Sequence, residues 1–347
     1  MKIAVFHNLP KGGAMRVVEE QVKGLKKKHH VDVFTPRVES YLHHESGIQR
    51  LKFDFFKFWT LRKIHQQLAE KIDKKNYDVV LVHPSKYTQA PYLLRNLRTR
   101  SFYYVHEVLR IGYEYNLRFQ KKVNIVKKIY EETTRFLRKK IDFENIKSAD
   151  RILANSCHTK EAAFKAYGVY SFVCYPGVDI DHFRPIVIKK KREVLFIGEP
   201  KKINGFDFLK KVISLIQPMI KLRVVRGNLS EKKLVEAYNQ AVAVVCASEV
   251  EPFGLVPLES MACQTPVIAV KEGGYRETVI NGVTGFLVDR EPKLFAEKIV
   301  FLLKNPKLAK KMGEAGRKYV KKEWSWNKSI KRLEERLNET ISFNNYC

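Results

Sequence analysis

The chain is poor in cysteine and lacks long apolar runs. Its five cysteines are odd in number and form no Cys-x-x-Cys pair, so the sequence indicates neither a disulfide framework nor a zinc knuckle. No uninterrupted apolar run approaches the roughly 18 residues of a membrane span. The first apolar run, residues 3–6, is too short for a signal peptide. We therefore expect a protein of the reducing cytoplasm with neither a signal peptide nor a membrane span.

Acidic residues are too few to balance the basic ones. The chain has 65 Lys and Arg against 37 Asp and Glu, a formal net charge of +28, and both halves carry the excess. This excess of positive charge suggests a polyanionic partner, which could be an acidic membrane, a nucleic acid or a phosphate-bearing ligand. Nucleic acid is the weakest of these, because the sequence contains no recognition module and no concentration of charge in one half.

Short β-rich apolar runs alternate with helix-compatible sequence over most of the 347 residues. This alternation predicts an α/β fold with parallel sheets covered on both faces, and the length suggests about two doubly wound domains. The predicted strands lie at 2–8, 30–36, 77–83, 101–107 and 149–156 and, after a Pro- and Gly-containing linker at 175–185, at 193–199, 221–227, 241–248 and 266–270.

Ligands of parallel sheets bind beyond the carboxyl ends of the strands. In the first half, the residues that follow predicted strands are Gly12, Gly13, His83, His106, Asn155 and Ser156. In the second half they are residues 198–205, Arg226, Gly227 and residues 248–259.

The segment 248–270 follows a predicted strand and opens a predicted helix near Gly254. Backbone N–H groups at the start of a helix form a seat for phosphate or diphosphate. Glu259 falls within the helix, where its carboxylate could accept hydrogen bonds from two vicinal sugar hydroxyls. The alternative is an acidic loop followed by a helix with a solvated glutamate.

The run from Glu251 to Glu259 resembles the Glu-x(7)-Glu motif of retaining glycosyltransferases of family 4. The resemblance extends over residues 12–17 (GGAMRV), 105–107 (VHE), 154–156 (ANS), 175–185, 261–289 and 323–326 (EWSW). It implies the GT-B fold, with two facing Rossmann-like domains. An acceptor-binding domain would span 1–185, a nucleotide-sugar-binding domain 186–325, and a helix within 326–347 would cross back to the first domain.

The resemblance also implies roles for individual residues. Glu259 would bind the ribose, Glu251 would bind the donor sugar and stabilise positive character at its anomeric carbon, and the backbone of Phe253, Gly254, Leu255 and Val256 would hold the diphosphate and sugar. Gly12 and Gly13 would let the backbone approach the donor phosphate and acceptor, and His106 would lie near the reacting sugar. The alternative for His106 is a strand-end histidine with a structural hydrogen bond.

The resemblance further implies a UDP- or GDP-sugar donor, transfer of a hexose with retention, and a glycan, a lipid-linked molecule or another hydroxyl as acceptor. The departing diphosphate would take the acceptor's proton. The nucleotide sugar is a substrate, and neither a cofactor nor a metal ion is expected.

One departure from the family pattern affects the diphosphate site. After the first strand of the second domain, the family has an Arg and a Lys. This chain has Glu199 and Asn204 at the corresponding positions. Lys202 or Arg226 could supply the missing charge. The alternatives are that backbone amides suffice, or that the protein is a catalytically impaired relative that only binds nucleotide sugars.

Two stretches combine basic and apolar residues, 52–64 and 118–140. The second has nine Lys or Arg and two Glu, a net +7, and its apolar stripe would be Phe119, Val123, Val126, Tyr130, Leu137 and Ile141. We expect a peripheral membrane surface for an anionic leaflet here. The alternative is that the aromatic residues belong to the core and the lysines to a solvated face.

Overall fold

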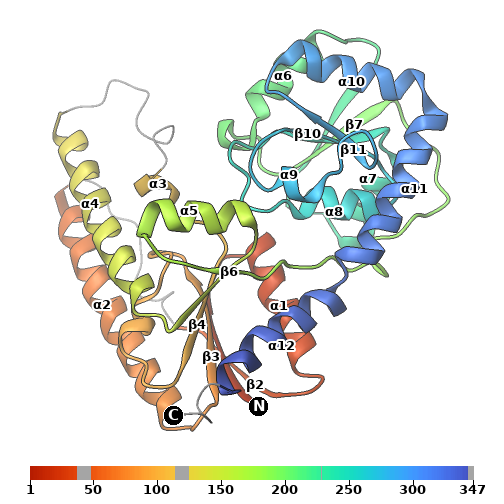
Figure 1. Cartoon of the computed structure of the whole chain (residues 1–347). Helices are drawn as coiled ribbons and strands as arrows, with labels where there is room; N and C mark the ends of the chain where they lie inside the picture. The colour runs from red at the N-terminus through yellow and green to blue at the C-terminus, as the bar shows by residue number, and fades with distance from the viewer. Residues whose placement is uncertain (37–47, 114–124, 228, 343–347) are drawn as a thin grey trace. The chain divides into compact units, whose positions relative to one another are not determined.

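The computed structural model describes residues 1–36, 48–113, 125–227 and 229–342, and it divides into two compact units (Figure 1). Unit 1 comprises Met1–Asn155, Thr159–Cys174 and the chain from Leu333 onward, and unit 2 comprises Ser156–His158 and Tyr175–Arg332. Each unit contains one parallel sheet. The predicted α/β fold with two parallel-sheet domains is confirmed.

The sheet of unit 1 has the strand order β2-β1-β3-β4-β5-β6. Its strands are β1 (Lys2–Asn8), β2 (His30–Phe34), β3 (Val79–Ser85), β4 (Ser101–Val105), β5 (Arg151–Ala154) and β6 (Phe172–Val173). The helices are α1 (Gly13–Leu25), α2 (Ile48–Asp73), the 3-10 turn η2 (Tyr92–Arg95), α3 (Arg110–Tyr113), α4 (Ile125–Lys147) and α5 (Cys157–Tyr167).

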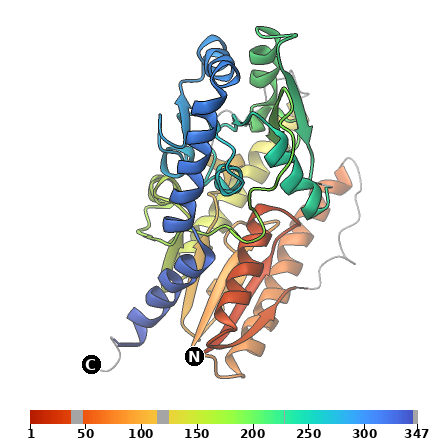
Figure 2. The same cartoon turned by 90° about the vertical axis from the view of Figure 1, so that its right-hand side faces the viewer.

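Buried apolar runs explain the central strands of unit 1. Every residue of β3 and β4 is buried, as expected for parallel strands with helices on both faces. In Figure 1, α2 and α4 lie on one side of this sheet and α1 on the other. Figure 2 shows α1 in red next to the strands.

The sheet of unit 2 has the order β11-β10-β9-β7-β8. Its strands are β7 (Glu193–Ile197), β8 (Lys221–Val225), β9 (Ala243–Cys246), β10 (Val267–Val270) and β11 (Gly285–Val288). The helices are the 3-10 turn η4 (Lys202–Asn204), α6 (Phe206–Ser214), α7 (Glu231–Gln240), α8 (Leu255–Ala262), α9 (Tyr275–Thr278), α10 (Pro292–Lys304) and α11 (Pro306–Glu323). In Figure 1, α6 and α10 lie above the sheet and α7 and α8 below it.

Residues 175–185, which the sequence presents as a linker, pack within unit 2. Val178 N–H donates to the Trp324 carbonyl at 2.8 Å, and Phe183 packs edge-on against Tyr238. A Cβ on Gly177 would lie 2.7 Å from the backbone of Trp326, so this approach requires glycine. The chain therefore passes into unit 2 at Tyr175, eleven positions before residue 186, where the second domain was expected to begin.

The last helix, α12 (Trp326–Ser342), follows the sequence prediction closely. Ile330, Leu333 and Leu337 are buried on one face, while the side chain of Ile341 lies outside the described residues. Within unit 1, Glu334 pairs with Lys28 at 2.9 Å and with His29 at 3.2 Å.

Every strand predicted from the sequence is present, but β6 and β11 were missed. β6 has only two residues. β11 has four residues, begins with Gly285, and follows a turn that contains Asn281 and Gly282. Both are too short or too rich in turn residues to show a strand period.

The predicted apolar stripe of the basic helix is divided in the structure: Val126 is exposed, whereas Tyr130, Leu137 and Ile141 are half-buried. In α4 the side chains of Ile125, Val126, Ile129 and Phe136 are 62–71% exposed. The packed face includes polar groups: the Asp142 carboxylate accepts hydrogen bonds from Ala90 N–H at 2.6 Å and from the Tyr167 hydroxyl at 2.5 Å. Asn145 donates to the Ala90 carbonyl at 2.7 Å. These hydrogen bonds fix the rotation of the helix and leave Ile125, Val126, Ile129 and Phe136 outside.

Parts of both basic stretches lie outside the described residues, namely residues 118–124 and the side chains of residues 52–56. Across the residues that the structure does describe, none of the helices combines the length and the apolar character needed to cross a bilayer.

Candidate nucleotide-sugar site

The carboxyl edge of the unit 2 sheet has its topological switch point at β7, which lies between β8 and β9. In doubly wound sheets the ligand crevice forms at such a point. The loops that follow β7 and β9 meet there. Glu249 N–H donates to the Ile203 carbonyl at 2.8 Å, and a Cβ on Gly205 would lie 1.8 Å from the Ala247 carbonyl oxygen. Close backbone packing therefore joins residues 198–205 to residues 247–249.

The segment that carries Glu251 is held from its other side by Gly273 and Gly274. Gly274 N–H donates to the Glu251 carbonyl at 2.8 Å. A Cβ on Gly273 would lie 2.4 Å from the Glu251 oxygen, and one on Gly274 would lie 2.5 Å from Phe253 Cα. The Gly273–Gly274 pair thus fixes the position of the first glutamate.

Phe253 anchors the start of α8. Its ring is buried against Tyr175, at a centroid distance of 6.1 Å, and against Trp324, at 5.5 Å. The next residue, Gly254, has φ of +99°, a conformation that glycine adopts readily. Leu255 and Val256 then form the first turn of α8, with Pro257 buried behind them. The Phe253 side chain is therefore part of the core, and its backbone leads into the helix.

The start of α8 offers donors to an anion. The first N–H groups of an α-helix have no partner within the helix, and α8 has no side-chain cap. The helix dipole adds partial positive charge at this end. The backbone from Phe253 to Val256 thus has the chemistry expected for a diphosphate seat.

Glu259 lies one turn further along α8 and is only 2% exposed. The Tyr238 hydroxyl, from α7, donates to Glu259 Oε2 at 2.5 Å. A solvated helix glutamate, the alternative weighed from the sequence, is wrong. The buried carboxylate is instead oriented by a neighbouring helix.

Glu251 is half-buried and accepts a long hydrogen bond of 3.5 Å from the Tyr275 hydroxyl. Both glutamates lie near the end of β9. Burial raises the pKa of the Cys246 thiol, and the negative charges of Glu251 and Glu259 raise it further. The motif therefore converges on one end of one strand.

In unit 1 the switch point lies between β1 and β3, because β1 pairs with β2 on one side and β3 on the other. Gly12 and Gly13 follow β1, and Gly13 begins α1. A Cβ on Gly12 would meet no protein atom within 4 Å, so packing within the unit does not demand glycine here. That space is compatible with close approach of a ligand.

Three buried histidines gather at the same edge: His7 on β1, His83 on β3 and His106 just after β4. His83 Nδ1 lies 3.1 Å from His106 Nε2, and the ring of Tyr104 lies beside both. The Asn155 amide donates to the His106 carbonyl at 2.8 Å. Burial lowers the pKa of His7, lowers that of His83 well below its usual 6.5 and lowers that of His106 to about 3. These imidazoles are neutral at physiological pH.

A family model described as Glycosyltransferase Family 4 matches residues 11–182, and one described as Glycosyl transferases group 1 matches residues 180–319. The chain belongs to glycosyltransferase family 4.

Family relatives match over part of their length. An uncharacterized glycosyltransferase of Methanocaldococcus jannaschii is 31% identical over 209 residues, which cover 57% of this chain and 55% of that protein. Human alpha-1,3/1,6-mannosyltransferase ALG2 is 29% identical over 230 residues, which cover 51% of this chain and 55% of that protein. The chain thus spans about half the length of these curated relatives.

Solved structures of the same fold cover nearly the whole chain. Sucrose-phosphate synthase from Thermosynechococcus elongatus has a TM-score of 0.76 at 20% identity and covers 98% of this chain and 99% of its own. Anabaena HepE, solved with UDP and glucose, has a TM-score of 0.71 at 17% identity and covers 97% of this chain and 99% of its own. These neighbours have the GT-B fold.

This family member lacks the usual cations after β7. The Asn204 amide donates to the Glu199 carbonyl at 2.8 Å and so closes the loop on itself. Lys202 is exposed within η4, and Arg226 is exposed directly after β8. Gly198 N–H donates to the Val225 carbonyl at 2.9 Å, which brings the end of β8 to the start of this loop. Both cations therefore lie beside the β7 loop.

Sequence reasoning missed Arg290, Tyr238 and Tyr275. Arg290 donates to the carbonyls of Ala247 and Ser248 at 2.9 and 3.1 Å and pairs with Glu272 at 2.7 Å. It follows β11, a strand that was itself missed. The tyrosines lie on helices, where no local pattern marks a side chain that reaches another element.

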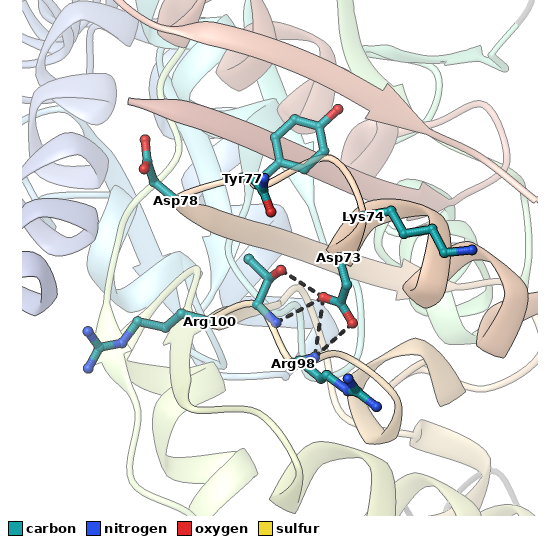
Figure 3. A pocket seen from close by; sticks show the side chains of 8 residues that line it. Asp73, Lys74, Tyr77, Asp78, Arg98 and Arg100 are labelled. Carbon is teal, nitrogen blue, oxygen red and sulfur yellow. Dashed lines mark hydrogen bonds between the residues drawn. The ribbon is translucent and has the colours of Figure 1, made fainter.

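A separate pocket of about 580 Å³ lies at the opposite, amino edge of the unit 1 sheet. Figure 3 shows its lining, in which Asp73 accepts hydrogen bonds from the Arg98 and Thr99 backbone. Tyr77 and Asp78 precede β3, and Arg100 precedes β4. The carboxylate of Asp73 therefore holds the turn before β4. In the described part of the chain, no three His, Cys, Asp or Glu side chains form a group suited to a metal ion.

Proposed function

We propose that this protein transfers a hexose-type sugar from a UDP- or GDP-sugar to a hydroxyl group of a glycan, lipid-linked or other acceptor, with retention at the anomeric carbon and without a metal ion. The observation that carries the proposal is the start of α8. An uncapped helix N-terminus lies at the switch point of the sheet, with Glu251 before it and the buried Glu259 within it.

The chemistry of these groups fits the parts of a nucleotide-sugar donor. The N–H groups of Leu255 and Val256 would hold the diphosphate and stabilise the negative charge that grows as it leaves. Glu259, oriented by Tyr238, would accept hydrogen bonds from the ribose hydroxyls. Glu251 would bind the sugar and stabilise positive charge at its anomeric carbon.

The neutral state of the buried histidines supports a mechanism without a protein base. With its pKa lowered to about 3, His106 is a weak proton acceptor at pH 7. The leaving diphosphate would take the acceptor's proton. Lys202 or Arg226 would offset the diphosphate charge in place of the missing family cations.

Relatives support the class of donor and leave the sugar open. They include mannosyltransferase ALG2 and alpha-maltose-1-phosphate synthase of Mycolicibacterium smegmatis, which is 36% identical over 144 residues. HepE has been solved with UDP-glucose. Family membership also favours glycosyl transfer over the alternative of nucleic-acid binding.

The test is a panel of UDP- and GDP-sugars assayed for hydrolysis and for transfer to simple acceptors, with and without EDTA. We expect turnover with at least one donor, unchanged by EDTA, and a product that keeps the donor's anomeric configuration by proton NMR. Binding without turnover would support the catalytically impaired alternative. Neither binding nor turnover with any donor would refute the proposal.

We also propose that α4 docks unit 1 on an anionic membrane. Four apolar side chains on α4, Ile125, Val126, Ile129 and Phe136, are exposed, and exposed lysines such as Lys128 and Lys140 lie on the same helix. Apolar insertion combined with lysine attraction to acidic lipids is the pattern of an interfacial helix. On α2, Trp59 is half exposed and lies beneath the Lys63 ammonium at 3.7 Å.

Sedimentation with anionic and neutral vesicles tests this docking. We expect binding to anionic vesicles alone, weakened about tenfold or more in Ile129→Ser/Phe136→Ser because two apolar side chains no longer insert. Val187→Ser, which removes an exposed apolar group from unit 2, is the matched control and should bind like wild type. Equal binding to both vesicle types would contradict the proposal.

A further inference from the structure

His83 is a buried histidine in a strand that otherwise favours apolar side chains. It is 0% exposed, whereas His106 is 7% exposed. A fully buried imidazole loses its hydration, so its place in β3 has a cost in stability. Because His83 is enclosed, it can influence a ligand only through a neighbour. Its hydrogen-bond neighbour is His106, through the 3.1 Å contact between Nδ1 and Nε2.

Two neutral rings in this contact allow two proton arrangements. In the first, His83 donates from Nδ1 to His106 Nε2, and His106 carries its own proton on Nδ1. In the second, His106 donates from Nε2, and His83 must carry its proton on Nε2. His83 Nε2 is buried and has no hydrogen-bond partner among the described residues.

The two arrangements differ in what they leave unpaired at His83 Nε2. The second buries an N–H donor without an acceptor, and orphaned buried N–H groups are rarer in proteins than under-satisfied acceptors. The first leaves only a lone pair. The burial of His83 therefore favours the arrangement in which His83 is the donor.

We propose that His83 is a positioning residue that fixes the ring and the tautomer of His106. It donates from Nδ1 to His106 Nε2 and so makes His106 a hydrogen-bond donor at Nδ1. The Asn155 amide, bound to the His106 carbonyl, holds the backbone of the same residue. The enclosed His83 thus holds His106 in one tautomer and one ring orientation.

The consequence for the reaction rests on the proposed function. A His106 that presents N–H at Nδ1 can donate to a sugar hydroxyl oxygen or another substrate oxygen, and it cannot accept a proton at that atom. His106 then orients the donor sugar or the acceptor. This agrees with a transfer in which the leaving diphosphate takes the acceptor's proton.

The direct test is a long-range proton–nitrogen NMR spectrum of the whole protein labelled with ¹⁵N-histidine. The signals of His106 are assigned by their loss in His106→Gln. We expect a neutral ring with its proton on Nδ1 in wild type and in His83→Asn, whose amide keeps a donor near the place of Nδ1. In His83→Leu the His106 ring should no longer be held in the single tautomer with its proton on Nδ1. His65→Leu, which replaces another fully buried histidine of unit 1, should leave the His106 signals unchanged.

Kinetics provide the second readout once a donor is known. His83→Leu should lower kcat about tenfold, as loss of one positioning hydrogen bond does, and His83→Asn should restore most of it. A His106 proton on Nε2 in wild type, or His106 signals that do not change in a folded His83→Leu protein, would overturn the inference. The NMR result stands whether or not any sugar nucleotide is turned over, so the two proposals fail separately.

Discussion

The Tyr238 hydroxyl donates a 2.5 Å hydrogen bond to the Glu259 carboxylate, and both side chains are buried. Tyr238 comes from α7 and Glu259 from α8, so the contact joins two helices at the carboxylate. A buried carboxylate with a defined direction is suited to recognise neighbouring hydroxyl groups.

Glu259→Gln should therefore weaken use of the donor. Hydrogen bonds to a charged group contribute roughly 1.5–3 kcal/mol, so we expect kcat/KM for the nucleotide sugar to fall about 10- to 100-fold. Tyr238→Phe should cost less, because it only releases the carboxylate. Glu297→Gln, an exposed glutamate on α10, is the control. Steady-state kinetics check this, and full activity in Glu259→Gln would contradict the ribose-binding role.

The roles of Lys202 and Arg226 at the diphosphate can be tested one at a time by single substitutions. If Lys202 or Arg226 offsets the diphosphate charge, the corresponding alanine variant should lower kcat/KM by about tenfold or more. Lys304→Ala, at the exposed end of α10, should have no effect. Turnover measured at low salt is the readout. Wild-type rates in both Lys202→Ala and Arg226→Ala would mean that the α8 N-terminus suffices by itself.

Gly205 joins the β7 loop to the end of β9, and alanine should disrupt this junction. Gly168→Ala, at φ of +65° with open space around its Cβ, should cost only the left-handed strain of about 1 kcal/mol. Gly205→Ala, at φ of +74°, adds a clash with the Ala247 oxygen, so we expect about 3 kcal/mol. Urea unfolding of both variants measures the difference. Equal losses would show that the loop can move away.

Acid should destabilise the protein through its buried histidines. Burial lowers the pKa of His65 to about 4, so the unfolded chain binds more protons between pH 6.5 and 4. The contribution of the buried, neutral His65 ring to the free energy of unfolding is complete above pH 6.5 and is lost as the pH falls towards 4. At pH 5 the loss is about 2 kcal/mol from this residue.

Unfolding of His65→Leu at pH 7.5 and pH 5 tests that effect. The variant should lose about 2 kcal/mol less than wild type over this interval. His30→Gln, which alters an exposed histidine, should follow wild type. An identical pH dependence in all three proteins would show that His65 does not titrate in this way.

Local sequence patterns were enough to predict the α/β architecture and the place of the donor motif. Buried apolar runs and the spacing of turn residues are local, so the strands from β1 to β5 and from β7 to β10 could be predicted. The Glu251 and Glu259 pair was equally visible, because both residues lie within one loop and the helix that follows it.

The contacts between side chains of different elements could not be predicted in this way, because they depend on how the strands and helices pack. The pairing of His83 with His106 depends on β3 and β4 being neighbours in the sheet, and the contact of Tyr238 with Glu259 depends on helix packing. Ile125, Ile129 and Phe136 of α4 face outward because Asp142 and Asn145 bind the backbone of Ala90 on the packed side. Periodicity marks an amphipathic face, but long-range hydrogen bonds decide which face is buried.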